Sequence, residues 1–584
     1  MEFIIYMVDE KIDNLLNLAL NVTDSELEKG YDLDTGYDSL NDTWEVIVKY
    51  NTSLDTLLQE GIKVTYLYGG YAVLIIPRDR IDYVAALPVI EYMEKPKSLY
   101  FAVNNAKHDS CFDSVQRRLF QNTAPGNVLF SGLTGKGTIV AVIDSGFDIF
   151  HPDFINNDGT SRILFLWDQS DDSGMPPEGY NIGTQYSREA INELINGPYI
   201  EMAGSEHGTH VLGIAAGNGR ASRGRYAGCA PECDIIAVKL GTARNNSFPM
   251  TSELIQAIDY SVRKAYGLGV PVAVNISYGN NYGSHAGDSL LENYITNAAS
   301  VGRSFIVVGT GNEGISGRHT SGRVGKTAER VEIAVYEYTS AFSVQIWKNY
   351  YDKFNVVITA PDGSSTGTLT QAGPVTKYRI YNTDILVYYG EPAPYSVNQE
   401  IYIDMSPEGD FFNGGIWTIE LIPEKIVSGE YYMWLPAGNS IYTDTLFLNP
   451  VADTTLTIPS TAGSVMSVGA YDSATDSIAP FSGRGYTTSG IVKPEIVAPG
   501  VDIISAAPRG GYTAKTGTSM ATPFVTGAAS CLMQWGIIDG NDPYLYADKL
   551  KAYLIAGARK LPGFDIWPNP QAGWGALCIS GSIP

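Results

Sequence analysis

Apolar and polar residues alternate along the first hundred positions in short runs separated by helical segments. From Trp44 the run WEVIVKY predicts a strand and SLDTLLQEG a helix. The segment IKVTYLYGGYAVLIIP predicts two strands with a tight turn at Gly69–Gly70. A helix over residues 79–87 and the strand VIEYMEK follow. A period of two marks a half-buried strand, whereas a period near 3.6 marks a helix. We therefore predict a ferredoxin-like β-α-β-β-α-β domain over residues 43–100.

One short amphipathic pattern precedes this domain. Ile12, Leu15, Leu16 and Ala19 are spaced as the apolar face of a helix, and the residues after them are acidic and polar. We therefore interpret residues 1–42 as a separate N-terminal helical extension.

Beyond Thr138 the pattern changes to apolar runs that alternate with helices. Between two of these runs TSELIQAIDYSVRKAYGLG has a helical apolar face, and we expect the helix to end at Gly267. We predict an α/β fold with a doubly wound parallel sheet, built from residues 101–318 and 456–584. The runs have the β-branched composition of strands covered on both faces. They are IVAVID (139–144), DIIAVKL (234–240), VPVAVNIS (270–277), SFIVVGTGN (304–312) and SVMSVGAYD (464–472).

Residues 319–455, which separate the two α/β segments, contain short alternating strands and no convincing helix. Gly, Pro, Asn and Asp divide runs such as AFSVQIW, FNVVITA and GIWTIEL. We predict an inserted all-β domain, a sandwich or jelly roll. Its tryptophans Trp347, Trp417 and Trp434 favour a buried core over the alternative, an exposed platform for a carbohydrate or protein.

The composition narrows the classes of partner. The 584 residues include 63 acidic and 39 basic side chains, which gives a net charge of −24. This charge disfavours attraction to nucleic acid or to an anionic membrane surface. No apolar stretch approaches the roughly 18 residues needed to cross a bilayer. We therefore expect neither nucleic acid nor membrane as a partner, and the sequence leaves the oligomeric state open.

The cysteines and the N-terminus bear on the cellular compartment. Cys111, Cys229, Cys233, Cys531 and Cys578 are too few for a disulfide framework, and we expect reduced, mostly buried thiols. The start MEFIIYMVDEK lacks the cationic region and the small-residue cleavage site of a secretion signal. These features predict cytoplasmic synthesis, and they leave spore association and non-classical release open.

Three polar segments carry candidate chemistry. Asp144 ends a predicted strand, where active sites of open parallel sheets form, although capping a helix is the simpler role for one Asp. His207 and His210 share a helical face in SEHGTHVLGIAAG, a spacing also seen in metal sites, but no third ligand lies nearby. Ser519 begins an apolar helix in TGTSMATPFVTG, as a cap or as a nucleophile stabilised by the helix dipole.

Together these segments lie in an order that changes the interpretation. DSG after a strand, HGTHVLGIAAG, GTGNEG and GTSMATPFVTG follow one another as Asp, His, Asn and Ser. This set of motifs resembles the subtilisin-like serine proteases, the subtilases (peptidase S8). The resemblance covers about residues 134–316 and 457–536, and residues 43 to about 100 resemble the family's inhibitory propeptide.

The resemblance implies a role for each motif residue. Ser519 would be the nucleophile, His207 the general base, and Asp144 the group that orients and stabilises the imidazole. Asn312 would donate to the oxyanion beside the backbone N–H of Ser519. His210 matches a structural histidine of the family. The residues implied to bind extended substrate or to wall the first specificity pocket are Ser277, Tyr278, Gly279, Gly309, Thr310 and Gly311.

Two features depart from the family pattern. Asp153 matches an acidic calcium ligand of the family, but the loop GNGRASRGRYAGCAP carries Arg220, Arg223 and Arg225 where many subtilases have an oxygen-rich calcium loop. Because three cations oppose a dication, we predict no metal and no other cofactor. The second departure is the β insert, together with a long spacing between the Asp and His motifs that includes SRILFLWDQSDDSG.

The prodomain-like segment, the insert and the missing export signal together resemble the clostridial Csp-type germination proteases. That group includes pseudoproteases without a complete triad, whereas all three triad residues are present here, which implies an active enzyme. The resemblance also implies a zymogen that cleaves itself and keeps its prodomain bound as an inhibitor. An uncleaved, permanent N-terminal domain is the alternative. We expect cleavage in the region of Lys97, Ser98, Leu99, Tyr100, Phe101 and Ala102.

These features lead to two competing functional hypotheses. The first is a serine endopeptidase that hydrolyses peptide bonds of a protein or zymogen substrate through an acyl-enzyme. The second is a non-catalytic signalling or scaffold protein on a subtilase fold, whose prodomain blocks the site permanently. The sequence does not reveal the substrate or the side-chain preference.

Overall fold

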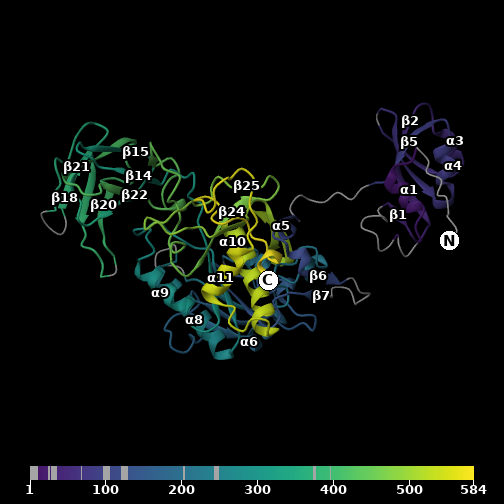
Figure 1. The fold of residues 1–584 in the computed structure, drawn as a ribbon, viewed down its shortest axis with the longest axis horizontal. Coiled ribbons are helices and arrows are strands. Elements are labelled where there is room, and N and C mark those ends of the chain that lie inside the picture. Colours follow the sequence, from purple (N-terminus) through teal and green to yellow (C-terminus); the bar gives the residue numbers. More distant parts are fainter. Residues whose placement is uncertain are drawn as a thin grey trace. The chain divides into compact units, whose positions relative to one another are not determined.

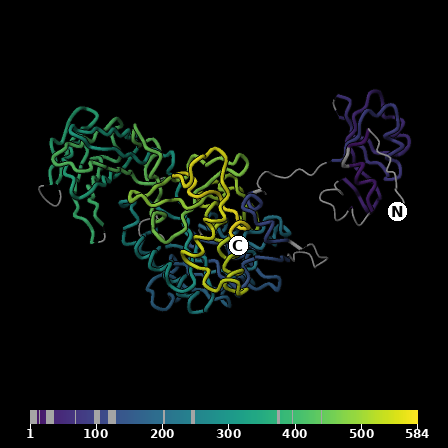
Figure 2. The backbone as a smooth tube through the Cα atoms, in the orientation of Figure 1, coloured from purple at the N-terminus to yellow at the C-terminus, as the bar shows by residue number. Residues whose placement is uncertain are grey.

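The chain forms two compact units, Met1–Phe101 and Ala102–Pro584 (Figure 1). Figure 2 follows the backbone of both units, with the C-terminal residues in yellow running through the larger one. The structure is a computed structural model, and it describes residues 11–23, 27, 36–67, 69–96, 105–119, 129–200, 204–241, 249–371, 376–394 and 396–584.

The N-terminal unit is a ferredoxin-like domain with one antiparallel sheet. Strand β4 lies between β2 and β3, while β1 and β5 pair with successive parts of β2. The chain order is the predicted β-α-β-β-α-β. The elements are α1 (Asn14–Leu20), β1 (Tyr37–Asp38), β2 (Thr43–Tyr50), α3 (Asp55–Gln59), β3 (Lys63–Leu67), β4 (Tyr71–Pro77), η1 (Arg78–Arg80), α4 (Ile81–Ala86) and β5 (Ile90–Glu94).

Helix α1 belongs to this domain and is not a separate extension. Ile12 and Leu16 are buried in the same core as Trp44 and Leu74 of the sheet. The backbone N–H of Met93 in β5 also donates to the carbonyl of Lys11, at 2.8 Å. The expectation of a separate extension over residues 1–42 was therefore wrong. A helix of seven residues is not stable by itself in water, and here the sheet covers its apolar face.

The larger unit is built on a sheet of nine strands in the order β10-β9-β11-β8-β12-β13-β24-β25, with β26 paired to β24. The central strands are parallel, as predicted, and β10 and β25 are antiparallel to their neighbours. Two hairpins, β6–β7 and β27–β28, lie outside it. The strands are β6 (Gln116–Leu119), β7 (Leu129–Gly132), β8 (Ile139–Asp144), β9 (Ile163–Asp168), β10 (Thr184–Ser187), β11 (Asp234–Lys239), β12 (Val272–Ile276), β13 (Ser304–Gly309), β24 (Met466–Asp472), β25 (Ser477–Ile478), β26 (Ile496–Pro499), β27 (Ile503–Ala507) and β28 (Gly511–Lys515).

Helices cover both faces of this sheet. In β8, Val140 and Val142 join a core with α7, α10 and α11, whereas Ile139 and Ala141 join a second core with α8 and α9. Because both faces of the sheet are covered, the strands are continuous apolar runs in the sequence. Among the described residues, no helix has the length and hydropathy that a membrane span requires. The helices are α5 (Asn105–Asp109), α6 (Arg188–Ile195), α7 (Ser205–Ala216), α8 (Thr251–Leu268), α9 (Leu290–Ala299), α10 (Thr518–Met533) and α11 (Ala547–Ala556).

The sequence-based predictions misplaced one helix end and missed β9, β10 and β25 of the nine-stranded sheet. Helix α8 runs through Gly267 and is terminated by Gly269, whose φ of 71° is the left-handed conformation that ends many helices. Strand β9 lies within SRILFLWDQSDDSG, a segment for which the sequence analysis predicts no strand. Its residues pair with β11 in the parallel sheet.

Between β13 and β24 the chain forms two antiparallel sheets that enclose one apolar core. One sheet has the order β14-β22-β16-β20-β19-β18 and the other β17-β21-β15-β23. Trp417 lies in the core and Trp434 is also buried, whereas Trp347 is partly exposed. The strands are β14 (His319–Arg323), β15 (Glu329–Val335), β16 (Phe342–Asn349), β17 (Lys353–Thr359), β18 (Thr376–Ile380), β19 (Thr383–Tyr389), β20 (Asn398–Pro407), β21 (Gly415–Lys425), β22 (Glu430–Trp434) and β23 (Leu446–Phe447).

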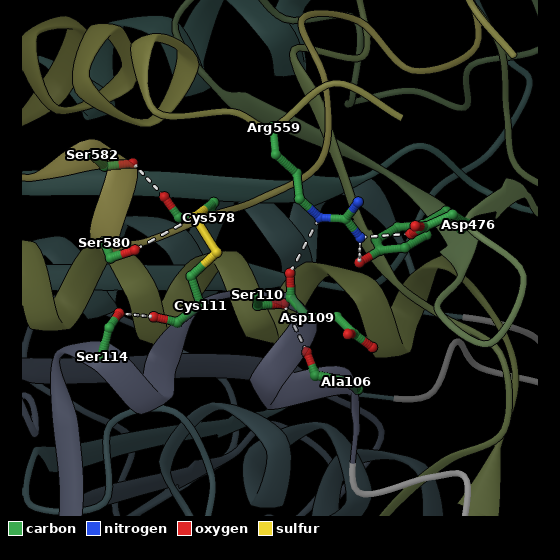
Figure 3. Close-up of a disulfide and its surroundings, with 11 residues drawn as sticks. Ala106, Asp109, Ser110, Cys111, Ser114, Asp476, Arg559, Cys578, Ser580 and Ser582 are labelled. Atoms are coloured by element: carbon green, nitrogen blue, oxygen red, sulfur yellow. Dashed lines mark hydrogen bonds and ion pairs between the residues drawn. A yellow bond between two sulfur atoms is a disulfide. The ribbon is translucent and has the colours of Figure 1, made fainter. Parts of the chain in front are cut away.

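The cysteine prediction was wrong for one pair. Cys111 and Cys578 form a disulfide between residues 467 positions apart, which joins the start of the larger unit to its end (Figure 3). Beside it Arg559 donates to the carbonyl of Asp109 at 3.4 Å and pairs with Asp476 at 2.6 Å. Counting cysteines could not reveal the pair, because only the fold brings the two ends together. The other three, Cys229, Cys233 and Cys531, are buried free thiols as expected.

Candidate active site

Asp144 and His207 meet at the carboxyl end of the central strand β8. Asp144 is fully buried, and its Oδ1 accepts hydrogen bonds from the backbone N–H of Ser145 at 2.7 Å and from His207 Nδ1 at 2.8 Å. His207 is the third residue of α7. At Gly208 a Cβ would lie 2.2 Å from the carbonyl oxygen of Gly146, so only glycine lets the helix approach the strand this closely.

The surroundings of His207 change its pKa in two opposite directions. Burial by itself would lower the pKa of His207, but the charge of Asp144 and its hydrogen bond outweigh that effect and raise the pKa above its ordinary value. Because Nδ1 donates to Asp144, the neutral ring presents Nε2 as a proton acceptor. The side chain is 37% exposed, so substrate and solvent can reach the ring.

The hairpin β27–β28 ties α7 to the segment that leads into α10. His210 Nε2 donates to the carbonyls of Ile503 at 2.9 Å and Thr513 at 3.0 Å, and burial lowers its pKa to about 4. Lys515 pairs with Glu206, the neighbour of His207, at 2.6 Å. His210 is therefore a neutral ring that holds the hairpin.

Ser519 is the second residue of α10 and is partly exposed. Gly517 precedes the helix with a φ of 155°, and its N–H donates to the carbonyl of Gly500 at 2.8 Å. Within the described part of the chain, no hydrogen bond joins the Ser519 hydroxyl to His207. Such contacts are often long without substrate. The sequence motif thus places the hydroxyl at a helix N-terminus, where the dipole favours negative charge.

Asn312 lies beside this turn, three residues after the end of β13. Its Oδ1 accepts hydrogen bonds from the backbone N–H of Thr518 at 3.1 Å and from the Thr518 hydroxyl at 3.2 Å. These bonds fix the amide and leave Nδ2 without a partner among the described residues. The backbone N–H of Ser519 is likewise unpaired there. Two hydrogen-bond donors are therefore available next to the Ser519 hydroxyl.

The segment of Ser277, Tyr278 and Gly279 follows β12 at the same edge of the sheet. In the described residues no backbone group pairs with the N–H or carbonyl groups of these three residues, although Asn280 bridges to Ile458. Burial and the nearby charge of Asp144 raise the pKa of Tyr278 to about 12. A free backbone edge next to Asp144 is what an added substrate strand needs, and its use by substrate stays a prediction.

The segment Gly309–Gly311 is more closely packed. A Cβ at Gly309 would lie 2.8 Å from Thr522 Oγ1 of α10, and one at Gly311 would lie 2.4 Å from Thr457 Cγ2. Thr310 is buried, and its backbone N–H donates to Val468 at 3.1 Å. Gly309 lets β13 approach α10, Gly311 lets the following segment approach Thr457, and the role of both as a pocket wall stays a prediction. The predicted cleavage region, Lys97 to Ala102, lies outside the described residues.

Asp153, which matches an acidic calcium ligand of the family, is bound by protein groups, and the absence of a metal here stays a prediction. Its carboxylate accepts from the backbone N–H of Ala221 at 2.9 Å and from the Tyr512 hydroxyl at 2.8 Å, and burial raises its pKa. Among the described residues, no group of three His, Cys, Asp or Glu side chains could hold a metal ion. Sequence reasoning missed Arg162, a buried arginine beside this loop, because nothing in its local sequence marks it.

Comparisons with known proteins place these motifs in a family. The model described as the subtilase family matches residues 135–403 and 430–575, and the model described as the Csp protease B prodomain matches residues 10–97. The prodomain match includes α1, in agreement with the shared core.

Two relatives that this chain matches are named as proteases. The minor extracellular protease Vpr of Bacillus subtilis (strain 168) is 26% identical over 480 residues, which are 77% of this chain and 52% of Vpr. The PI-type proteinase of Lactococcus lactis subsp. cremoris is 26% identical over 461 residues, 72% of this chain and 24% of that protein. This chain thus spans about half or less of these relatives.

One solved structure matches a larger share of both chains. The structure of the Clostridium perfringens CspB protease is 31% identical, with a TM-score of 0.73, and the match covers 82% of this chain and 97% of that one. The subtilase model matches more than half of the chain, and a Csp prodomain precedes it. The protein therefore belongs to the subtilase family, as a subtilase of the Csp type.

Proposed function

We propose that this protein is a serine endopeptidase that hydrolyses peptide bonds in protein substrates. The observation that carries the proposal is one pairing: buried Asp144 holds His207 at Nδ1, while Nε2 and the Ser519 hydroxyl have no partner in the described residues. The anchored amide of Asn312 stands beside them. Family membership and protease relatives support the same activity.

The proposed reaction follows from these positions. His207 Nε2 accepts the proton of Ser519 as the hydroxyl oxygen attacks the peptide carbonyl carbon, and Asp144 stabilises the imidazolium. The resulting oxyanion receives hydrogen bonds from Asn312 Nδ2 and the Ser519 backbone N–H. His207 then gives its proton to the leaving amine as the C–N bond breaks. Water hydrolyses the acyl-enzyme by the same proton transfers.

We also propose that the protein is made as a zymogen that cleaves itself between Lys97 and Ala102 and retains the prodomain as an inhibitor. The Csp prodomain match supports this. So does an exposed apolar face of the prodomain sheet, opposite its helices, which includes Ile47, Leu67 and Tyr71. Exposed patches of this kind mark binding surfaces.

The test compares the full chain with its Ser519→Ala variant, and with Ser300→Ala, which removes an exposed hydroxyl at the end of α9. Each protein is run on a denaturing gel, its N-terminus is sequenced, and it is treated with a fluorophosphonate probe. We expect the parent and Ser300→Ala to be cleaved and labelled, and Ser519→Ala to be neither.

The outcomes separate the two functional hypotheses. A full-length parent that does not react with the probe would support the non-catalytic scaffold protein and overturn the protease proposal. A parent that is labelled but uncleaved would keep the protease and remove self-cleavage. Cleavage that persists in Ser519→Ala would assign processing to another enzyme.

A further inference from the structure

Arg162 lies in a buried cage of main-chain carbonyl oxygens. It directly precedes β9 and is 3% exposed. Its Nη1 donates to the carbonyl of Asp153 at 3.0 Å and, over a shorter contact, to that of Ala216. Its Nη2 donates to the carbonyls of Cys233 at 2.8 Å and Ala230 at 3.5 Å. One guanidinium thus joins four carbonyls from three segments of the chain, because Ala230 and Cys233 lie in the same turn.

Among the described residues, no anion pairs directly with this cation. In the described part of the chain, no carboxylate lies within ion-pair distance of Arg162, and burial lowers the pKa of the guanidinium. The nearby Cys233 thiol is neutral, because burial raises its pKa to about 12. An arginine stays charged even when it is buried. Carbonyl dipoles therefore compensate the charge, as they do around a hard metal cation in an oxygen cage.

The cage and the loop around it do not fit calcium. Calcium takes six to eight oxygen ligands and prefers carboxylates. Here the carbonyl oxygens accept hydrogen bonds from the guanidinium. The two oxygens of the Asp153 carboxylate already accept hydrogen bonds from the Ala221 backbone N–H and the Tyr512 hydroxyl. A second side-chain cation, Lys107, donates to the carbonyl of Gly228 on the same loop at 2.8 Å.

The cage connects elements that carry both proposed catalytic side chains. Ala216 is the last residue of α7, the helix of His207, and a cation at a helix C-terminus is stabilised by the dipole. Asp153 binds Tyr512 in β28, the strand that leads to Ser519. Any cation in the cage therefore fixes the end of α7 and, through Asp153, the approach to α10.

We propose that Arg162 is the protein's built-in cation at this site and does the work that a bound calcium ion would do. The loop after α7 then keeps its conformation without metal, and the stability of the larger unit does not depend on calcium at this place. The proposal concerns stability and does not rest on the proposed protease activity.

The test measures thermal unfolding of the full chain in the Ser519→Ala background, which prevents self-digestion. The variants are Arg162→Ala, Arg162→Met, Arg162→Lys and the control Arg263→Ala, which removes an arginine that is 74% exposed. Each is measured with EDTA, with calcium, and with millimolar guanidinium against sodium at equal ionic strength.

We expect Arg162→Ala and Arg162→Met to lower Tm by roughly 5 °C or more, because unpaired buried carbonyls are costly. Arg263→Ala should leave Tm nearly unchanged. Arg162→Lys should keep more stability than Arg162→Met, because it keeps the charge. Guanidinium should raise the Tm of Arg162→Ala but not that of the parent, and EDTA should not lower the Tm of the parent.

Two results would overturn the proposal. Equal Tm for the Lys and Met variants would show that the cage does not need a cation. A parent that loses stability in EDTA and regains it with calcium, a response lost in the Arg162 variants, would show that metal binds here beside the arginine. If Arg162→Ala does not fold, the other two variants and the EDTA measurement on the parent decide.

Discussion

Helix α7 has a buried charge near each end, and the two charges are compensated in different ways. Near the first turn, the carboxylate of Asp144 is paired with His207, a group that can gain or lose a proton and is 37% exposed. At the last turn, the guanidinium of Arg162 is paired with the carbonyl of Ala216 and other main-chain carbonyls, which do not titrate.

The difference explains how one helix can adjoin a titratable pair at one end and a pair that does not titrate at the other. A buried charge whose partner exchanges protons with solvent can drive proton transfer. A buried charge held by neutral dipoles can only fix geometry, and it does so at every physiological pH. We call the N-terminal end of α7, with Asp144 and His207, its front, and the C-terminal end, with Arg162, its back. We expect substitutions at the front to change catalytic rate and substitutions at the back to change stability.

The largest expected effect is that of Asp144→Asn at the front. The neutral amide no longer stabilises the imidazolium and permits the wrong tautomer, so kcat should fall by about 10⁴-fold. Tm should change little, because the substitution removes a buried charge. It also removes the carboxylate that favours the protonated form of His207. Peptide hydrolysis and thermal unfolding measure the two effects, with Asp158→Asn, an exposed carboxylate, as the control. A collapse of Tm with unchanged kcat in the folded fraction would contradict the comparison.

Asn312→Ala tests the neutral group beside the reactive end. Losing one oxyanion donor should lower kcat by roughly 10²- to 10³-fold with little change in KM. Thr518→Val keeps the amide but removes one of the two bonds that orient it, so its loss should be smaller. Steady-state kinetics of both variants measure this order. An unchanged kcat for Asn312→Ala would remove Asn312 from the proposed oxyanion site.

The pH dependence should differ between the two ends. The base must be neutral, so kcat/KM should fall about tenfold per pH unit below the pKa of His207, which lies above its ordinary value of about 6.5. Because the pKa is raised in the fold, the stabilisation from His207 is present at low pH and is lost as pH rises through the folded pKa. Arg162 does not titrate in this range. A kcat/KM profile with its midpoint below about pH 6.5 would contradict the raised pKa.

The smallest expected effect is that of Tyr512→Phe at the back. It removes the hydroxyl that donates to Asp153 at 2.8 Å, which should cost about 1–2 kcal/mol of unfolding free energy. The value of kcat should stay within about twofold, because the hydroxyl contacts no reacting group. Denaturant unfolding and peptide hydrolysis provide the two measurements. A large loss of kcat at unchanged stability would show that the two ends are not separable.

Much of the fold and of the candidate site could be predicted from the sequence, because the signals are local. Strands covered on both faces are continuous apolar runs, and the split β-α-β-β-α-β pattern marks the first domain. Asp144, His207, Asn312 and Ser519 each lie in a contiguous motif, so their identities did not depend on knowing the fold.

The tertiary structure decided what depends on contacts between distant segments. The apolar face of α1 is short, and only the sheet showed that it belongs to the prodomain core. Cys111 and Cys578 pair because the fold brings the two ends of the larger unit together. Neither cysteine is marked as paired by its own neighbours in the sequence.

Arg162 shows most clearly what could not be predicted from the sequence. The sequence drew attention to Arg220, Arg223 and Arg225 as cations opposed to calcium, yet the buried cation is an arginine outside that loop. Its partners are main-chain carbonyls, which every residue has and no sequence pattern displays. The sequence by itself therefore determined which residues make up the Asp, His, Asn and Ser motifs, whereas the tertiary structure decided where backbone groups converge and which cation they hold.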